Sequence, residues 1–265
     1  MTSTPKREDS QPIDQDGPRR VPFAQAQGSG TPDVPPGDVR AWLAAADRLG
    51  GLRVIEGVDI ETSVGRIAEM LHHTDESPAV LFDAIPGYEP GYRLLVNALG
   101  SRPRLAMTLG LEPTIGPFEL MDEWERRLNE VTPLPVRIVD DGPVLEHVQR
   151  GDDVDLLRLP TPLWHPEDGG PYIGTGCGVL TRDPDSDWVN MGTYRAQLHD
   201  RNHTGLYISP GKHGRIHRDK YFARGEPMPA VILVGLPPLQ FIASALEIPN
   251  GVSELEWVGG VLGTP

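Results

Sequence analysis

Cysteine, long apolar runs and positive charge are all scarce in this sequence. The 265 residues contain one cysteine, Cys177, which excludes an internal disulfide framework and fits a reducing compartment. No apolar run approaches the ~20 residues that span a bilayer, and the first residues lack the apolar core of a secretory signal peptide. Lys+Arg 24 against Asp+Glu 38 gives a net charge of −14, which repels phosphate backbones. We therefore expect a cytoplasmic protein that binds neither nucleic acid nor a membrane.

The common catalytic and metal-binding motifs are missing as well. The sequence contains no HExxH or CxxC spacing, no GxGxxG, no Walker loop and no GxSxG elbow, so a zinc site is not indicated and no reaction is named by these motifs. His213 and His217 are four residues apart. Pro210 and Gly214 nevertheless argue against a helix that would bring both imidazoles to one face.

Glycine and proline, by contrast, are abundant. Gly 30 and Pro 28 make up more than a fifth of the chain, which predicts many turns and short elements. Residues 1–36 carry few large apolar side chains and are predicted to be a disordered tail. Order begins at Asp38, which is suited to cap a helix. Apolar spacing then predicts helices over 39–49 and 62–73 and strands over 52–55, 78–83 and 93–97, an order typical of a small α/β domain.

The remaining sequence predicts a helical linker followed by a β-dominated domain. One amphipathic helix is expected over about 118–131. Strands are predicted over 143–149, 172–181, 187–198, 230–235 and 253–262, with a helix near 218–224 and a short helix or strand over 241–245. Asp152, Asp153 and Asp155 lack the glycine and the bidentate glutamate of a calcium loop, so we interpret them as a solvated turn.

Residues 187–198 form the most informative predicted strand. Asn190, Gly192 and Tyr194 share one parity of this strand, and Arg195 and Gln197 share the other. A glycine weakens a strand unless a ligand or another backbone approaches closely. The pattern fits a strand that lies against a ligand and offers Arg195 as a fixed cation. It fits an edge strand with a surface arginine equally well.

Alternating glycines mark the predicted strand over 172–181. Gly174, Gly176 and Gly178 strip side chains from one face, so either a flat ligand lies on the backbone or two sheets pack tightly there. Cys177 points to the other face. Because no basic neighbour would lower the pKa of its thiol, we interpret it as a small core residue.

Three stretches together resemble the UbiD-type decarboxylases, a family that uses prenylated FMN. The first, over 40–104, ends in Asn97-Ala-Leu-Gly-Ser-Arg-Pro-Arg104. The second runs from Gly151 through Pro166-Glu-Asp-Gly-Gly-Pro171 to an N-x-G-x-Y-R motif that begins at Asn190. The third is an S-E-x pattern at Ser253. Where the family places proline or methionine before that pattern, this chain has Leu246 and Glu247.

The resemblance implies a fold and a domain order. An α/β (α+β) N-terminal domain over 37–112 would follow the disordered tail and lead through a helical linker over 113–143. A β-rich split-barrel domain that binds prenylated FMN would occupy 144–265. That domain is expected to be incomplete at its C-terminal side, since the predicted strand over 253–262 stops without a capping element.

The resemblance also implies a site. Asn190, His213 and Glu254 match the ligands of a divalent metal, manganese or magnesium, with a potassium ion often nearby; hard oxygen ligands and one imidazole suit such ions. The cofactor contacts would be Thr175, Asn190, Thr193, Tyr194, Arg195, Lys212, His213, Gly214 and Glu254. Arg195 would be the catalytic residue that orients the carboxylate of an α,β-unsaturated or aromatic acid.

The family's proton donor comes from an E-G-P-x-G-[E/D] motif, which this sequence does not contain. We therefore expect a prenylated-FMN-dependent carboxy-lyase that is incomplete as this chain, supplied with cofactor by a flavin prenyltransferase. The alternative is a companion flavin-binding subunit that needs a partner chain for the acid, within a homo-oligomer or a complex with a C-terminal chain. An ordinary FMN reductase is disfavoured because it would not need Asn190, His213 and Glu254 together.

Overall fold

Residues 38–265 are the part of the chain that the computed structural model describes, so the predicted tail over 1–36 lies outside the described residues. The first unit runs α2 (Val39–Arg48), β1 (Leu52–Glu56), α3 (Val64–His72), β2 (Ala79–Asp83) and β3 (Leu94–Val96). β1 and β2 pair in parallel, and β3 adds to β2 in the antiparallel sense. Since parallel neighbours need a crossover, α3 links them. The five predicted elements of this region are confirmed.

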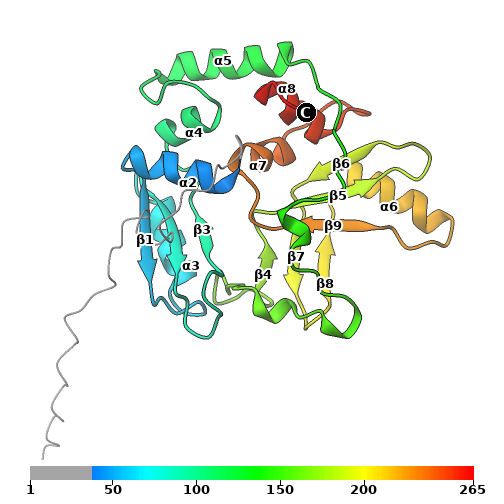
Figure 1. Cartoon of the computed structure of the whole chain (residues 1–265), viewed down its shortest axis with the longest axis horizontal. Coiled ribbons are helices and arrows are strands. Elements are labelled where there is room, and N and C mark those ends of the chain that lie inside the picture. Colours follow the sequence, from blue (N-terminus) through cyan, green and yellow to red (C-terminus); the bar gives the residue numbers. More distant parts are fainter. Residues whose placement is uncertain (1–37) are drawn as a thin grey trace, which may run out of the picture.

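Local signals explain why this unit forms where it does. The Asp38 carboxylate accepts a hydrogen bond from the backbone N of Arg40 at 2.6 Å and caps α2. Gly50, at a φ of 68°, follows the end of α2. Both faces of the sheet are buried, one against Trp42 of α2 and the other against Val64 of α3. Figure 1 shows this unit at the left of the molecule.

The connection to the second unit holds two helices and a long irregular segment. α4 (Arg102–Thr108), which was not predicted, is followed by α5 (Pro117–Glu130). The strand predicted over 143–149 is wrong. Its residues are exposed and contain only a 3-10 turn (Pro143–Leu145), because no strand edge lies alongside to accept their backbone groups. The aspartates after it lie in exposed 3-10 turns (Gly151–Asp153 and Leu156–Arg158) or beside them, as interpreted.

Two separate three-stranded antiparallel sheets make up the β-rich part of the chain. One holds β4 (Tyr172–Gly174), β7 (Arg195–Leu198) and β8 (Thr204–Tyr207) in the order β4-β7-β8. The other holds β5 (Gly178–Arg182), β6 (Val189–Gly192) and β9 (Ala230–Leu233) in the order β6-β5-β9. The single strands predicted over 172–181 and 187–198 are therefore wrong, since each stretch breaks and contributes to both sheets (Figure 1).

Three helices accompany these sheets, so the region is less β-dominated than predicted. α6 (His213–Ala223) begins five residues before the predicted helix, because Gly214 is tolerated in its first turn. α7 (Pro238–Ala245) settles the ambiguous segment over 241–245 as a helix, with Pro238 in the first turn where its missing N–H costs nothing.

α8 (Glu254–Leu262) replaces the strand predicted over 253–262, which is wrong. Its N-terminus carries a capping box: Ser253 Oγ accepts from Leu255 N, and Ser253 N donates to the Glu256 carboxylate. Gly260 lies so close to the backbone carbonyl of Thr132 that a side chain there would collide with it. The glycines therefore serve close helix packing rather than a strand.

A shared apolar core joins the helices to the second sheet. Leu120 of α5, Met191 of β6, Leu239 of α7 and Trp257 of α8 all belong to it. Within residues 38–265 the two small sheets are not joined by a strand pair, so no closed barrel is recorded. The same described range contains no helix with the length and apolar character needed to cross a bilayer.

Candidate functional site

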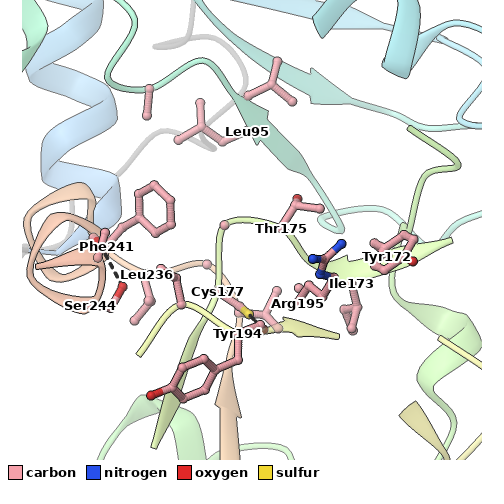
Figure 2. Close-up of a pocket in the computed structure, with 18 of the residues that line it drawn as sticks. Leu95, Tyr172, Ile173, Thr175, Cys177, Tyr194, Arg195, Leu236, Phe241 and Ser244 are labelled. Atoms are coloured by element: carbon pink, nitrogen blue, oxygen red, sulfur yellow. Dashed lines mark hydrogen bonds between the residues drawn. The ribbon is translucent and has the colours of Figure 1, made fainter. Parts of the chain in front are cut away.

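A cavity of about 1350 Å³ lies between the N-terminal unit and the two small sheets. β3 and the residues after it form one wall; the segment from β4 to β5, the junction of β6 and β7, and α7 form the others. Figure 2 shows Leu95 of β3 on the side of the open space opposite Phe241, Thr175 and Arg195. A space of this size is ample for a ligand larger than a typical drug molecule.

The glycines of the β4–β5 segment divide between the two interpretations. A Cβ on Gly174 would lie 2.9 Å from the backbone N of Ala196, and one on Gly178 would lie 2.9 Å from Leu236 Cδ1. These two glycines serve tight packing. Gly176, however, has no atom within 4 Å of that position and lines the cavity. Of these three glycines, Gly176 alone leaves open space for a ligand within the described residues.

Cys177 is a core residue, as interpreted. Its side chain is 2% exposed, its Sγ donates to the backbone O of Tyr194 at 3.5 Å, and burial raises the pKa of its thiol. Figure 2 shows Cys177 beside Tyr194 in the cavity wall. The thiol is therefore protonated at neutral pH and offers no thiolate nucleophile.

Arg195 opens onto the cavity from the start of β7. Its guanidinium carbon lies 5.1 Å from the centre of the Tyr207 ring, within the range of a cation–π contact. In residues 38–265 no carboxylate forms an ion pair with Arg195. The cation is thus held in place by an aromatic face while its donors remain available to an anion in the cavity.

Asn190, Tyr194 and Gly214 form one buried hydrogen-bonded group. The Tyr194 hydroxyl accepts from Asn190 Nδ2 at 3.2 Å and from the backbone N of Gly214 at 3.1 Å. A Cβ on Gly214 would lie 2.6 Å from the Tyr194 ring, so the close approach requires glycine. Because His213 directly precedes Gly214, this group brings the β6–β7 junction to the N-terminus of α6.

Glu254 is a buried carboxylate at the first position of α8. It is 2% exposed, and its Oε2 accepts from the backbone N of Met191 at 2.6 Å. Desolvation raises the pKa of Glu254 to about 7. No Lys or Arg of the described chain pairs with it. The buried carboxyl group lies next to Asn190, because it bonds to the backbone of the following residue, and no cation of the described chain offsets the cost of ionising it.

His213 lies against the Trp188 ring, with centroids 4.8 Å apart, and burial lowers the pKa of this histidine. Trp188 Nε1 in turn donates to the backbone O of Val252 at 3.1 Å, two residues before Glu254. The Trp188 indole therefore contacts His213 and also holds the segment that leads to Glu254.

Lys212, which directly precedes α6, forms an ion pair with Glu247 at 3.2 Å.

The structure brings the predicted site residues to one place. All of Thr175, Asn190, Thr193, Tyr194, Arg195, Lys212, His213 and Glu254 line the cavity, and Gly214 lies just behind Tyr194. In residues 38–265 no three His, Cys, Asp or Glu side chains are grouped as a metal site; the predicted trio instead includes an asparagine.

Sequence reasoning gives no role to two residues behind this site, Trp188 and Thr181. The expectation that Pro210 and Gly214 prevent a helix carrying both His213 and His217 is wrong. α6 does carry both histidines, and both pack against Trp188.

Comparison with known proteins identifies the family of the chain. Residues 43–124 match the 3-octaprenyl-4-hydroxybenzoate carboxy-lyase N-terminal domain, and residues 137–265 match the Rift-related domain of the same proteins. The chain belongs to the UbiD family. The UbiD N-terminal domain covers the sheet of β1 to β3, and the Rift-related domain covers both small sheets.

Similar UbiD-class proteins are decarboxylases. The chain is 34% identical over 236 residues to the pyrrole-2-carboxylic acid decarboxylase of Pseudomonas aeruginosa, covering 86% of this chain and 47% of that protein. It is 31% identical over 225 residues to ferulic acid decarboxylase 1 of Saccharomyces cerevisiae, covering 80% and 44%. This chain therefore spans about half the length of these relatives.

Solved structures show the same fold. The closed form of vanillic acid decarboxylase from Sedimentibacter hydroxybenzoicus matches with a TM-score of 0.79 and 27% identity, covering 87% of this chain and 49% of that one. An evolved dimeric form of the UbiD-class enzyme HmfF from Pelotomaculum thermopropionicum, in complex with prFMN, matches with a TM-score of 0.74 and 27% identity, covering 86% and 51%.

Proposed function

We propose that this chain forms the flavin-binding part of a non-oxidative decarboxylase that acts on an α,β-unsaturated or aromatic carboxylic acid through prenylated FMN. A single observation carries the proposal: one cavity is lined both by an exposed arginine, Arg195, and by a buried carboxyl group, Glu254, and within residues 38–265 neither has a partner of opposite charge. The flavin domain would be the split barrel expected from the resemblance. The decarboxylase names of its relatives support the reaction class.

Asn190, His213 and Glu254 would hold a manganese or magnesium ion, with potassium nearby. The chemistry of the donors fits, since an amide oxygen, a carboxylate and an imidazole suit hard divalent cations. The raised pKa of Glu254 supports the assignment, because a bound cation would offset the cost of burying its charge. Lowering of the pKa of His213 by burial keeps its imidazole neutral and able to ligate.

Lys212, Thr193 and the N-terminus of α6 would contact the phosphate of the flavin. Anions are favoured at helix N-termini, and Thr193 is held by a hydrogen bond of 3.0 Å from its backbone N to Ser244 O. Thr175 and Gly176 would lie beside the flavin ring, where the wall is open. When bound, prenylated FMN would supply the electron sink for loss of carbon dioxide.

Arg195 would orient the substrate carboxylate. Its position above Tyr207 limits its rotamers, so little entropy is lost when an anion binds. A guanidinium presents a rigid fork that matches a carboxylate in bidentate geometry. Arg195 would bind the acid and stabilise developing charge but would not transfer a proton, since a guanidinium is not deprotonated in proteins.

Flavin retention tests the proposal. The purified chain is mixed with FMN or prenylated FMN and Mn²⁺, desalted, and its flavin absorbance measured. We expect the chain to retain flavin, the Glu254→Gln variant to lose it, and a Glu226→Gln variant, changed at an exposed position outside the cavity, to behave as wild type. A colourless wild-type protein would refute the proposal. Unchanged flavin retention by Glu254→Gln would favour an ordinary flavin reductase.

A companion subunit is the second candidate, and the similar vanillic acid decarboxylase supports it, because that enzyme is a VdcCD complex in which VdcD is a separate component. The chain spans about half the length of its relatives, and the family's acidic motif does not occur in this sequence. The proton donor would then come from another polypeptide segment. Since general acid catalysis is typically worth ~10²–10⁴-fold, this chain alone should decarboxylate slower than a full-length relative by such a factor. Equal turnover would contradict the need for a partner.

A further inference from the structure

His217 is an unusual histidine, because it is completely buried and only half satisfied. It lies on α6 with 0% exposure, and its Nδ1 lies 3.0 Å from Thr181 Oγ1. Its Nε2 is the one buried side-chain nitrogen or oxygen in residues 38–265 that lacks a hydrogen-bond partner. Trp188 packs edge-on against the ring at 4.8 Å. Keeping an imidazole in such a place costs stability, so a specific role must be sought.

The surroundings of His217 determine which nitrogen carries the proton. Burial lowers the pKa of His217, so the ring is neutral and has one donor and one acceptor. Asp183 Oδ2 lies 3.9 Å from Nε2 and is held from its other side by Lys220 at 2.7 Å. A proton on Nε2 is attracted by that carboxylate, whereas a lone pair there would be repelled. Nδ1 is therefore the acceptor, and the Thr181 hydroxyl donates to it.

The direction of the hydrogen bond from Thr181 to His217 also determines how the side-chain amide of Asn190 is oriented. With its proton committed to His217, Thr181 Oγ1 is an acceptor, and Asn190 Nδ2 lies 3.4 Å from it. The second proton of the same amide goes to the Tyr194 hydroxyl at 3.2 Å. The contact with Thr181, which does not line the cavity, places the nitrogen of Asn190 on the side away from the open space. Its Oδ1 then faces the space that Asn190 lines.

We propose that His217 and Thr181 are positioning residues that lock the side-chain amide of Asn190 with its oxygen toward the metal position. The inference rests on the proposed function, because it assigns the oriented oxygen to a divalent cation. The opposite amide orientation would present two N–H groups, which repel a cation. We call the hydrogen-bonded chain His217–Thr181–Asn190 the relay. Without it, both amide orientations become accessible, and metal binding weakens because part of the binding free energy is used to select the orientation with the oxygen toward the metal.

Manganese binding tests the relay independently of catalysis. The electron paramagnetic resonance signal of free Mn²⁺ is titrated against the protein in the presence of FMN. Second-layer partners of ligands typically contribute 10–100-fold to metal affinity, so Thr181→Val and His217→Leu should weaken Mn²⁺ binding by about that factor. Thr181→Ser, which restores the hydroxyl, and His217→Asn, which restores an acceptor near Nδ1, should bind more tightly than their apolar counterparts. Thr204→Val, on β8 and outside the cavity, is the matched control.

Folded apolar variants that bind Mn²⁺ as wild type does would overturn the inference, with folding judged by circular dichroism and melting temperature. The tautomer of His217 gives a second test that needs no variant. Long-range ¹H–¹⁵N correlation spectra of the wild-type protein should show that Nε2 of His217 is protonated and that Nδ1 is unprotonated. An Nδ1–H tautomer would refute the relay. Wild-type protein that binds no Mn²⁺ would instead refute the proposed metal site, so the two failures are distinguishable.

Discussion

The Tyr194 hydroxyl is the point at which the stability of the site can be tested most directly. It accepts hydrogen bonds from the backbone N of Gly214 and from Asn190 Nδ2, and Tyr194 is 7% exposed. Tyr194→Phe removes only this oxygen and keeps the ring that fills the space between Gly192 and Gly214. The variant therefore leaves two buried donors without their acceptor while preserving the packing.

The expected cost follows from those two donors. A buried donor that loses its partner costs about 1–3 kcal/mol. The loss at Asn190 lies at the lower end, because its amide keeps the contact with Thr181, whereas Gly214 N has no second acceptor in the described chain. We expect Tyr194→Phe to reduce the free energy of unfolding by about 2–4 kcal/mol. At ~2–4 °C per kcal/mol, the melting temperature should fall by roughly 4–16 °C.

Urea denaturation followed by fluorescence, with calorimetry for the melting temperature, measures this loss. Tyr207→Phe is the control, since Tyr207 is exposed and its hydroxyl makes no hydrogen bond within residues 38–265. Its ring, the part that contacts Arg195, is retained. If Tyr194→Phe costs no more than Tyr207→Phe, the hydroxyl does not hold the β6–β7 junction to α6, and the buried group described above is wrong.

Three further predictions concern residues in the cavity wall and at the start of the adjacent helix α8. In Gly65→Ala the new Cβ would collide with the carbonyl oxygen of Trp164. The ~1–3 kcal/mol cost of overpacking outweighs the ~1 kcal/mol gain in helix propensity, so the urea midpoint of unfolding should fall. A rise in that midpoint would contradict the contact. Because burial raises the pKa of Cys177, Ellman's reagent should label it at pH 7 only after unfolding, whereas rapid labelling of native protein would show an accessible thiol. Ser253→Ala removes the cap of α8 and should cost about 0.5–2 kcal/mol by thermal denaturation, with no change expected if α8 is held by packing alone.

The N-terminal unit was predictable from sequence because its signals are local. Asp38 caps α2, Gly50 follows it, and the apolar periods of the helices and strands agree with one another. The helix α8 was predictable in principle too, since Ser253 and Glu256 form a capping box in the sequence. Alternation of Leu255 and Trp257 with polar or small residues favours a strand, so the two local signals in this segment conflict.

The breaks in the two central stretches were not predictable from local sequence. Thr175 to Cys177 and Thr193 to Tyr194 contain no proline, and Gly176 and Gly192 weaken a strand without indicating that the chain changes sheet there. The chain breaks there because β4 pairs with β7 while β5 pairs with β6 and β9, and those pairings depend on residues distant in sequence. The same holds for the relay, since Thr181 and His217 are 36 residues apart. The family resemblance supplied eight residues that line the cavity and Gly214 behind Tyr194, but not Thr181, Trp188 or His217.

The break between β6 and β7 explains how one short stretch supplies both Asn190 and Arg195 to the same cavity. In a continuous strand, Asn190 and Arg195 would lie on opposite faces, and one of them would point away from any shared ligand. The backbone N of Thr193 instead bonds to Ser244 O of α7, and the chain passes from one sheet to the other at this point. The change of sheet turns Arg195 toward the same cavity that Asn190 lines. An insertion of one residue at Thr193 should therefore abolish ligand binding more severely than removal of either side chain, because it disturbs both ends together.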